Sequence, residues 1–311
     1  MKSISKISGV GFLMLMLFIA CEKVEQPSYQ TKAEAQLITD LAYGNDPKQT
    51  MDVYLPPNRT SNTSVIIFVH GGSFIGGDKN DYKAHAIYLA NCGYAVLNVN
   101  YRLVNGTGLS ETRLEPPHIE SEVKIKDQVN DVATVVDFAI AHAKEWVVSN
   151  KRIAIAGHSA GGTLALLYSY DARNTNKVQA VSNMAGALDL VFTNVSNWQF
   201  YPRYVFEGGF RYTGFDISIA NEKYYKEISP LFTATENKRI STINIFPQNN
   251  EVMGLPNQDL ATFDRFTTRL DELKVPNEFL YVSGADHNFS QTGKWQLVLD
   301  STVAYFNKNI K

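Results

Sequence analysis

The chain has 311 residues, of which 44% are hydrophobic and 19% are charged, and its formal net charge is -2. This length and this balance predict an ordinary globular protein with a sizeable buried core. Nucleic-acid binding needs a clustered basic face, and the sequence has no block of like charges, so a nucleic-acid partner is excluded.

The first twenty residues form a distinct segment. Lys2 and Lys6 give it a positive start, and an unbroken apolar run covers residues 10–20. This run has the length of a signal-peptide core and is too short for a membrane-spanning helix, which needs about 20 apolar residues. We therefore expect residues 1–20 to be a signal peptide.

Cys21 follows the apolar run directly. The letters FIAC at residues 18–21 resemble the lipobox of bacterial lipoproteins, with Phe18 in the place that Leu usually takes. The resemblance implies cleavage before Cys21, lipidation of Cys21 and a lipid anchor that holds the protein to a membrane of the cell envelope. The alternative is plain secretion, or release into the periplasm, by a peptidase that ignores Cys21.

Residues 21–40 are polar and mixed, and we expect them to be a tether between the anchor and the domain. After cleavage the remaining cysteine outside the anchor is Cys92, and one thiol alone cannot form an internal disulfide. Cys92 lies at a predicted helix-to-strand junction, where a buried small side chain is expected.

From about residue 41 the sequence alternates between short apolar runs and amphipathic stretches. The apolar, β-branched runs are typical of parallel strands buried on both faces, and they cover residues 64–69, 94–100, 152–156, 178–181, 242–246 and 278–282. Helices are expected at residues 82–90, 160–170, 258–273 and 294–307, with a long amphipathic helix between Ile125 and Ala143. This alternation predicts one α/β domain over residues 41–311, a doubly wound and mostly parallel sheet with its ligand site beyond the carboxyl ends of the strands.

Residues 188–225 interrupt this alternation. The segment has no clear helical or strand period, and aromatic residues are crowded into it. An irregular insertion of this length inside a compact domain is usually functional, so we expect a cap over the active site. The alternative is a surface excursion with a small core of its own.

The pentapeptide Gly157-His158-Ser159-Ala160-Gly161 matches the pattern G-x-S-x-G. It follows one predicted strand and runs into a predicted helix, which is the strand–elbow–helix setting of a nucleophilic serine. The serine must occupy a strained turn, and only glycine fits beside it. Ser159 is therefore the candidate nucleophile. A phosphate-binding turn is the alternative, but the lysine of a Walker loop and the spacing of a dinucleotide fingerprint are missing.

A second motif, His70-Gly71-Gly72-Ser73, follows the predicted strand at residues 64–69. Acyl transfer builds negative charge on a carbonyl oxygen, which N–H donors must stabilise. Consecutive glycines let the backbone approach that oxygen closely. With the strand–elbow–helix motif, donors come from this loop and from the residue after the nucleophile, so we expect Gly71, Gly72 and Ala160 to form the oxyanion hole.

His287 is the only histidine after Ser159 in the sequence, and it follows the last predicted strand. Because the base follows the nucleophile in this arrangement, His287 is the candidate general base. A purely structural role for His287 would leave Ser159 without any base.

The residue that orients the base must lie between Ser159 and His287. Glu251 is the first carboxylate after the strand predicted at residues 242–246, and it is the candidate for this role. Asp259 and Asp264 are the alternatives, and a solvated loop charge is the non-catalytic interpretation of Glu251.

Several motifs together resemble one family. They read MDVYLPP at 51–57, HGGSFIGGDK at 70–79, NVNYRL at 98–103, GHSAGG at 157–162, SPLF at 229–232 and DHNF at 286–289. The chain resembles the bacterial α/β-hydrolase esterase/lipase family, which includes hormone-sensitive-lipase-like and feruloyl-esterase-like carboxylesterases. The family usually has Gly-x-x-Asp where this chain reads QNNE at 248–251, and residues 188–225 carry no family pattern.

The resemblance implies an α/β-hydrolase fold and hydrolysis of ester bonds, often of acetyl, feruloyl or other short acyl esters on glycans or small molecules, with no metal and no organic cofactor. It assigns Ser159 as nucleophile, His287 as base, and Gly71, Gly72 and Ala160 as oxyanion donors. The predicted function is thus that of a serine carboxylesterase. The alternatives are a serine peptidase of the prolyl-oligopeptidase type, an aryl formamidase and a non-catalytic binding protein with a hydrolase fold.

Overall fold

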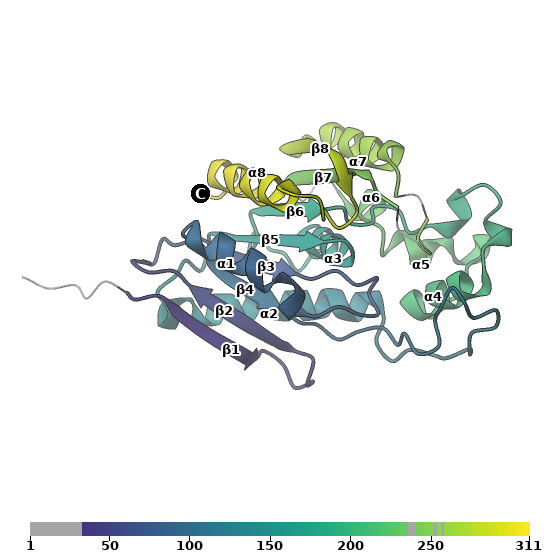
Figure 1. Ribbon diagram of the computed structural model, residues 1–311, viewed down its shortest axis with the longest axis horizontal. Helices are drawn as coiled ribbons and strands as arrows, with labels where there is room; N and C mark the ends of the chain where they lie inside the picture. Colours follow the sequence, from purple (N-terminus) through teal and green to yellow (C-terminus); the bar gives the residue numbers. More distant parts are fainter. Residues whose placement is uncertain (1–32, 236–239, 252–253, 257) are drawn as a thin grey trace, which may run out of the picture. The chain divides into compact units, whose positions relative to one another are not determined.

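The computed structural model describes residues 33–235, 240–251, 254–256 and 258–311. Residues 32–311 form one compact unit, which contains a sheet of eight strands in the order β1-β2-β4-β3-β5-β6-β7-β8 (Figure 1). The strands are β1 (Gln36–Ala42), β2 (Thr50–Leu55), β3 (Val65–Val69), β4 (Ala95–Val99), β5 (Ile153–His158), β6 (Ala180–Met184), β7 (Ser241–Asn249) and β8 (Asn277–Asp286). The pairs β1–β2 and β2–β4 are antiparallel, and the other pairs are parallel.

The central strands are buried on both faces, which is why they read as unbroken apolar runs. In β3, Ile67 packs into one core cluster while its neighbours Ile66 and Phe68 pack into the other. One face is covered by α2 (Ile125–Trp146), α3 (Ala160–Ser169) and α7 (Leu260–Glu272), and the other by α1 (Lys83–Asn91) and α8 (Lys294–Asn309). The predicted doubly wound, mostly parallel sheet is confirmed.

Strand β1 corrects the predicted start of the domain. Residues 36–38, which were expected to belong to the tether, pair with β2, so that Gln36 lies opposite Leu55. Most side chains of this edge strand are exposed, so its sequence lacks the apolar pattern that marks the other strands. The predicted signal peptide, Cys21 and the tether up to residue 32 lie outside the described residues.

Cys92 is exposed, so the expectation of a buried thiol is wrong. It lies at the C-cap of α1, in the turn before Gly93, where the chain has already left the packed part of the helix.

Of the helices in the described ranges, none combines the length and the apolar character that a membrane span requires.

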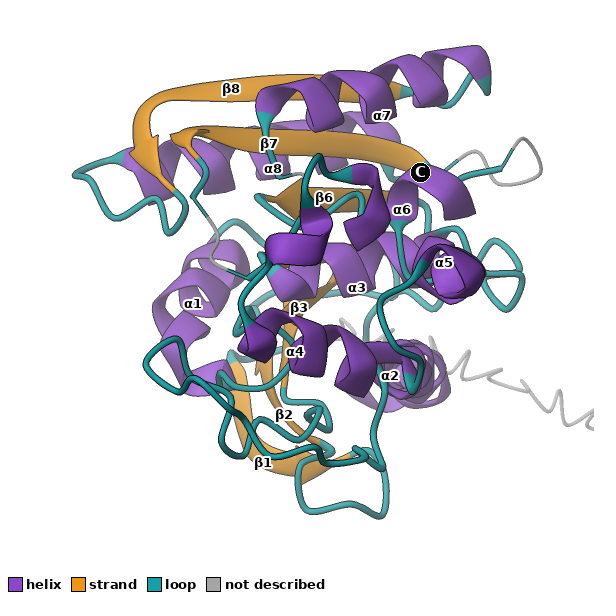
Figure 2. Ribbon diagram, turned by 90° about the vertical axis from the view of Figure 1, so that its right-hand side faces the viewer, coloured by secondary structure: helices purple, strands orange, loops and turns teal. Residues whose placement is uncertain are grey.

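The segment predicted as an irregular cap is built from short helices. They are η2 (Phe192–Asn194), η3 (Trp198–Phe200), α4 (Arg203–Thr213), η4 (Ile219–Asn221) and α5 (Glu222–Lys226), and α6 (Pro230–Thr233) follows them. In Figure 1, α4 and α5 lie at the right-hand end of the molecule, and Figure 2 looks onto this end with both helices near the viewer. The helical period of α4 is hidden in the sequence because the helix buries charged residues, Glu207 and Arg211.

Arg211 ties α4 to the loop between β4 and α2. Its side chain is completely buried, and it donates to Glu207 Oε1 at 2.8 Å. It also donates to the carbonyl oxygens of Asn105 at 2.7 Å, Thr107 at 2.8 Å and Pro117 at 2.7 Å. Hydrogen bonds from an ionised donor are stronger than neutral ones, so this side chain fixes the loop on the cap helix.

We expect Arg211→Met to lower the free energy of unfolding by about 3–5 kcal/mol, because it removes the charged partner of the buried Glu207 carboxylate and the donor to three carbonyl groups. Chemical denaturation followed by circular dichroism measures the change. Arg203→Met on the same helix is the control, since Arg203 is exposed, and its effect should stay within about 0.5 kcal/mol. Equal stability of the two variants would contradict the role given to Arg211.

Candidate active site

Ser159 lies in a sharp turn between β5 and α3. Its backbone angles are φ 52° and ψ -125°, outside the regions that L-residues usually adopt. The Ser159 N–H donates to the carbonyl of Met184 at the end of β6, at 2.8 Å, and this bond holds the turn against the sheet. The turn places the serine hydroxyl at the carboxyl end of a central strand, where α/β folds bind their ligands.

The two glycines of the motif are required by close backbone packing. A Cβ on Gly157 would lie 2.3 Å from the carbonyl oxygen of Gly161, and a Cβ on Gly161 would lie 2.1 Å from that of Val69 in β3. These neighbours are backbone atoms of the sheet and the helix, which cannot move aside. The sequence analysis inferred this steric requirement from the motif alone.

His287 meets Ser159 across the end of the sheet. It is the first residue after β8, and its Nε2 lies 2.9 Å from Ser159 Oγ. The structure thus brings together the two residues that the sequence selected as nucleophile and base, although 128 positions separate them.

The other ring nitrogen of His287 faces Asn250 and not the predicted Glu251. His287 Nδ1 lies 2.7 Å from Asn250 Oδ1. In the parallel pair of β7 and β8, Asn249 lies opposite Asp286, so the next residues of the two strands, Asn250 and His287, meet.

Glu251 is one position further along the chain, its side chain is exposed, and no hydrogen bond or ion pair joins it to His287 in the described structure. The expectation for Glu251 is therefore not met. The two alternatives are also placed elsewhere: Asp259 caps α7 by accepting from Thr262 N at 2.9 Å, and Asp264 is exposed on that helix.

Burial keeps the imidazole of His287 neutral. It lowers the pKa of His287 from the ordinary 6.5 to about 4. The neighbouring Asp286 acts in the opposite direction on this pKa, but its carboxylate is turned to Ser290, whose N–H donates to it at 2.9 Å. A neutral imidazole has one nitrogen free to accept a proton, as a general base requires.

A chain of hydrogen bonds behind the site joins three loops. His158 Nε2–H donates to the carbonyl of His287 at 2.8 Å, and Tyr82 Oη donates to His158 Nδ1 at 2.7 Å. Burial lowers the pKa of His158 to about 3, so this ring is also neutral. Neither residue could be predicted from the sequence, because His158 occupies a variable position of the elbow motif and Tyr82 precedes a helix without any motif of its own.

The three predicted oxyanion donors differ in their surroundings. Gly71 lies against the nucleophile, since a Cβ on it would be 3.1 Å from Ser159 Cβ, but its N–H is already directed to Tyr82 Oη at 3.4 Å. The N–H groups of Gly72 and Ala160 have no acceptor among the described residues. Gly72 has φ 128°, and Ser73 after it has φ 52°, so the loop turns sharply here. Gly72 and Ala160 are thus the predicted donors that are free for a ligand.

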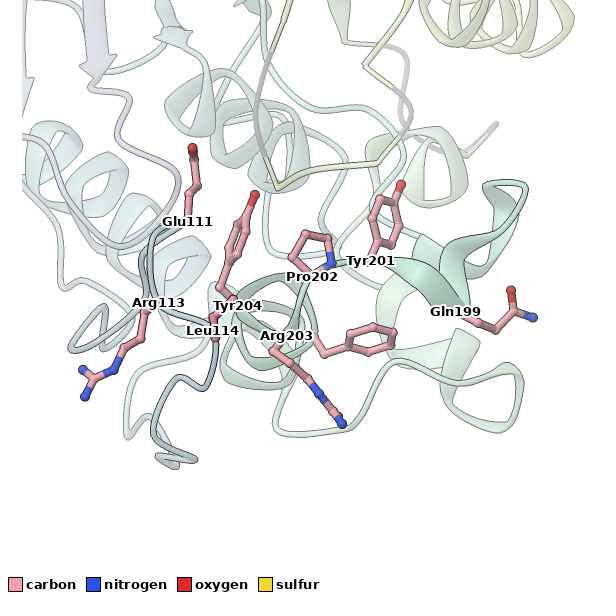
Figure 3. Close-up of a pocket in the computed structure, with 9 residues that line it drawn as sticks. Glu111, Arg113, Leu114, Gln199, Tyr201, Pro202, Arg203 and Tyr204 are labelled. Carbon is pink, nitrogen blue, oxygen red and sulfur yellow. The ribbon is translucent and has the colours of Figure 1, made fainter.

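Two cavities lie between α4 and the loop that contains Glu111, and the smaller one also reaches Ser73 of the glycine loop. A cavity of about 180 Å³ is lined by Ser73, Tyr204 and Tyr212 among others, and Tyr204 also lines a larger one of about 470 Å³. Figure 3 shows the larger cavity, with the hydroxyl groups of Tyr201 and Tyr204 on one side and Arg203 pointing outward. Within the described ranges, no three His, Cys, Asp or Glu side chains gather in a group that could ligate a metal ion.

The chain is similar to known proteins both in sequence and in structure. An arylesterase of Saccharolobus solfataricus is 26% identical over 246 residues, 76% of this chain and 71% of that protein. A probable isoprenylcysteine alpha-carbonyl methylesterase of Arabidopsis thaliana is 30% identical over 129 residues, 40% of this chain. The aligned part spans 23–35% of the length of this and two further plant methylesterases that the chain matches.

Among solved structures, a truncated carbohydrate esterase from gut microbiota superposes with a TM-score of 0.67 at 18% identity, covering 91% of this chain and 98% of that one. Est2 of Thermogutta terrifontis superposes with a TM-score of 0.64 at 18% identity, covering 88% and 92%. These similarities show the α/β-hydrolase fold. The BD-FAE family model matches residues 51–238, more than half of the chain, from β2 through the elbow to beyond α6. The chain therefore belongs to the BD-FAE family, an α/β-hydrolase esterase family.

Proposed function

We propose that the protein is a serine carboxylesterase that works through an acyl-enzyme intermediate. The observation that carries this proposal is the contact of Ser159 Oγ with a neutral His287 imidazole at 2.9 Å, on a strained turn beside a glycine loop. Membership of an esterase family and the esterase names of its relatives support the same reaction.

The geometry suggests the order of steps. His287 Nε2 takes the hydroxyl proton as Ser159 Oγ attacks the ester carbonyl carbon. The oxygen that becomes negative faces the free N–H groups of Gly72 and Ala160. His287 then gives its proton to the departing alcohol, which leaves Ser159 acylated. Water, deprotonated by His287, attacks the acyl group, and the acid departs as Ser159 regains its proton.

For the substrate we propose a short acyl ester, such as an acetyl or feruloyl ester, on a glycan or a small molecule. The cavity of about 180 Å³ beside Ser73 suits a small group, and the aromatic-lined cavity of about 470 Å³ next to it suits a sugar or a phenolic ring. The carbohydrate esterase among the structural neighbours points the same way.

A prolyl-oligopeptidase-type peptidase is the second candidate, because a dipeptidyl aminopeptidase of Pseudoxanthomonas mexicana is 25% identical over 73% of this chain.

We also propose that the mature protein is lipid-anchored at Cys21 to a membrane of the cell envelope, on the evidence of the FIAC sequence after an apolar run. Expression in a bacterial host with radiolabelled palmitate should label the wild-type protein and leave Cys21→Ala unlabelled. Equal labelling of both forms, or of neither, would contradict the anchor.

The esterase activity should depend on Ser159. Purified protein should hydrolyse p-nitrophenyl acetate and react covalently with a fluorophosphonate probe, and Ser159→Ala should lose the labelling and about 10⁴–10⁶-fold in kcat. Ser61→Ala, at an exposed position remote from Ser159 in the sequence, is the control and should keep both the probe labelling and the esterase activity. Folded protein that fails to react with the probe would favour a binding protein, and activity on proline peptides alone would favour the peptidase.

The pH profile should follow the low pKa of His287. Protonation of His287 removes the lone pair that receives the serine proton, so kcat/KM should hold down to about pH 5 and fall below it, with a midpoint near 4. The measurement is kcat/KM against pH, with circular dichroism at each pH to show that the protein stays folded. A midpoint at or above 6.5 would mean that burial does not control this histidine.

A further inference from the structure

The hydrogen bond between Asn250 and His287 puts a neutral amide where serine hydrolases usually have a carboxylate. We propose that Asn250 is the positioning residue of the catalytic histidine, and that the site works as a Ser159–His287–Asn250 triad. The proposal rests on the proposed function, and it replaces the role that sequence analysis gave to Glu251.

The surroundings of Asn250 fix the direction of its amide. Its Nδ2 donates to the carbonyl oxygen of Gln258 at 2.7 Å. A carbonyl oxygen accepts only, so the NH₂ group must face Gln258 and the Oδ1 atom must face His287. Gln258 is itself held, because its side chain donates to the carbonyl of Asp189 at 3.2 Å and accepts from the N–H of Leu188 at 3.3 Å.

This direction of the amide selects the tautomer of His287. Because Asn250 Oδ1 accepts at 2.7 Å, the ring proton must be on Nδ1, and the lone pair of Nε2 then faces Ser159 Oγ. Replacing the triad aspartate of a serine protease by asparagine costs about 10⁴-fold in kcat, because the histidine then adopts the wrong tautomer. In the present structure Gln258 prevents that outcome.

A neutral amide and a carboxylate differ in charge, and this difference separates the proposal from a purely structural role. An amide orients the ring but adds no negative charge that would favour the imidazolium. The charged or titratable groups next to His287 are Asp286, which binds Ser290, and the buried, neutral His158. Both groups remain when Asn250 is changed, so a change in the titration of His287 reports on position 250.

The test compares Asn250→Ala, Asn250→Asp and Glu251→Gln with the wild type. Asn250→Ala should lower kcat for p-nitrophenyl acetate by about 10²-fold or more, because the ring is no longer oriented, while KM changes little. Asn250→Asp should raise the midpoint of the acidic limb by about 1 to 3 pH units, because a carboxylate favours the charged imidazole. Glu251→Gln, the neighbouring control, should match the wild type in both respects.

A second readout does not need turnover. Nitrogen-15 spectra of the His287 ring, assigned with His287→Gln, should show a proton on Nδ1 in the wild type and the raised titration midpoint in Asn250→Asp. If the wild type hydrolyses no ester but shows these signals, the proposed function fails and the role of Asn250 stands. The proposal is overturned if Glu251→Gln reproduces the loss of kcat, if Asn250→Ala keeps its kcat, or if Asn250→Asp leaves the midpoint unchanged.

Discussion

The close approach of α3 to β3 is the constraint on which the rest of the site depends. Two glycines without side chains let the helix start directly above the sheet, and the backbone of Ser159 takes up the strain between them. Once this turn is fixed, the serine hydroxyl projects from the carboxyl end of a central strand. The histidine then has to come from another strand end at the same edge of the sheet, and β8, which is separated from β5 by β6 and β7, places it 2.9 Å from Ser159 Oγ.

Much of the fold could be predicted from the sequence, because the central strands are buried on both faces and their apolar runs are unmistakable. The same holds for Ser159 and His287. The G-x-S-x-G motif identifies Ser159, and His287 is the only histidine that follows Ser159 in the sequence. Strand β1 escaped prediction because it is an exposed edge, and α4 escaped because a buried ion pair interrupts its apolar period. Asn250 escaped for a chemical reason. Asparagine is not the residue type expected to orient a catalytic histidine, and its contact with His287 is set by the register of β7 and β8, which a single sequence does not display.

Burial keeps both histidines of the site uncharged, but the two rings differ in their hydrogen-bond partners. His158 is buried, and both of its ring nitrogens are hydrogen-bonded, one to Tyr82 and one to the backbone of His287. Its protonation state is therefore expected to stay the same. His287 is less enclosed and reaches the reacting hydroxyl. Charge that appears during the reaction is therefore confined to one ring, and the other acts as a fixed support for the loop that carries it.

Arg211 joins the two walls of the cavities beside α4. The two cavities have one wall on α4, which includes Tyr204, and one on the loop around Glu111. The loop is fastened to α4 on both sides of Glu111, through the carbonyl groups of Thr107 and Pro117. We expect two walls that are pinned together to keep the same spacing whether or not a cavity is occupied. Cavities of fixed width would select ligands by size and shape, in contrast to enzymes that close around a substrate after it has bound.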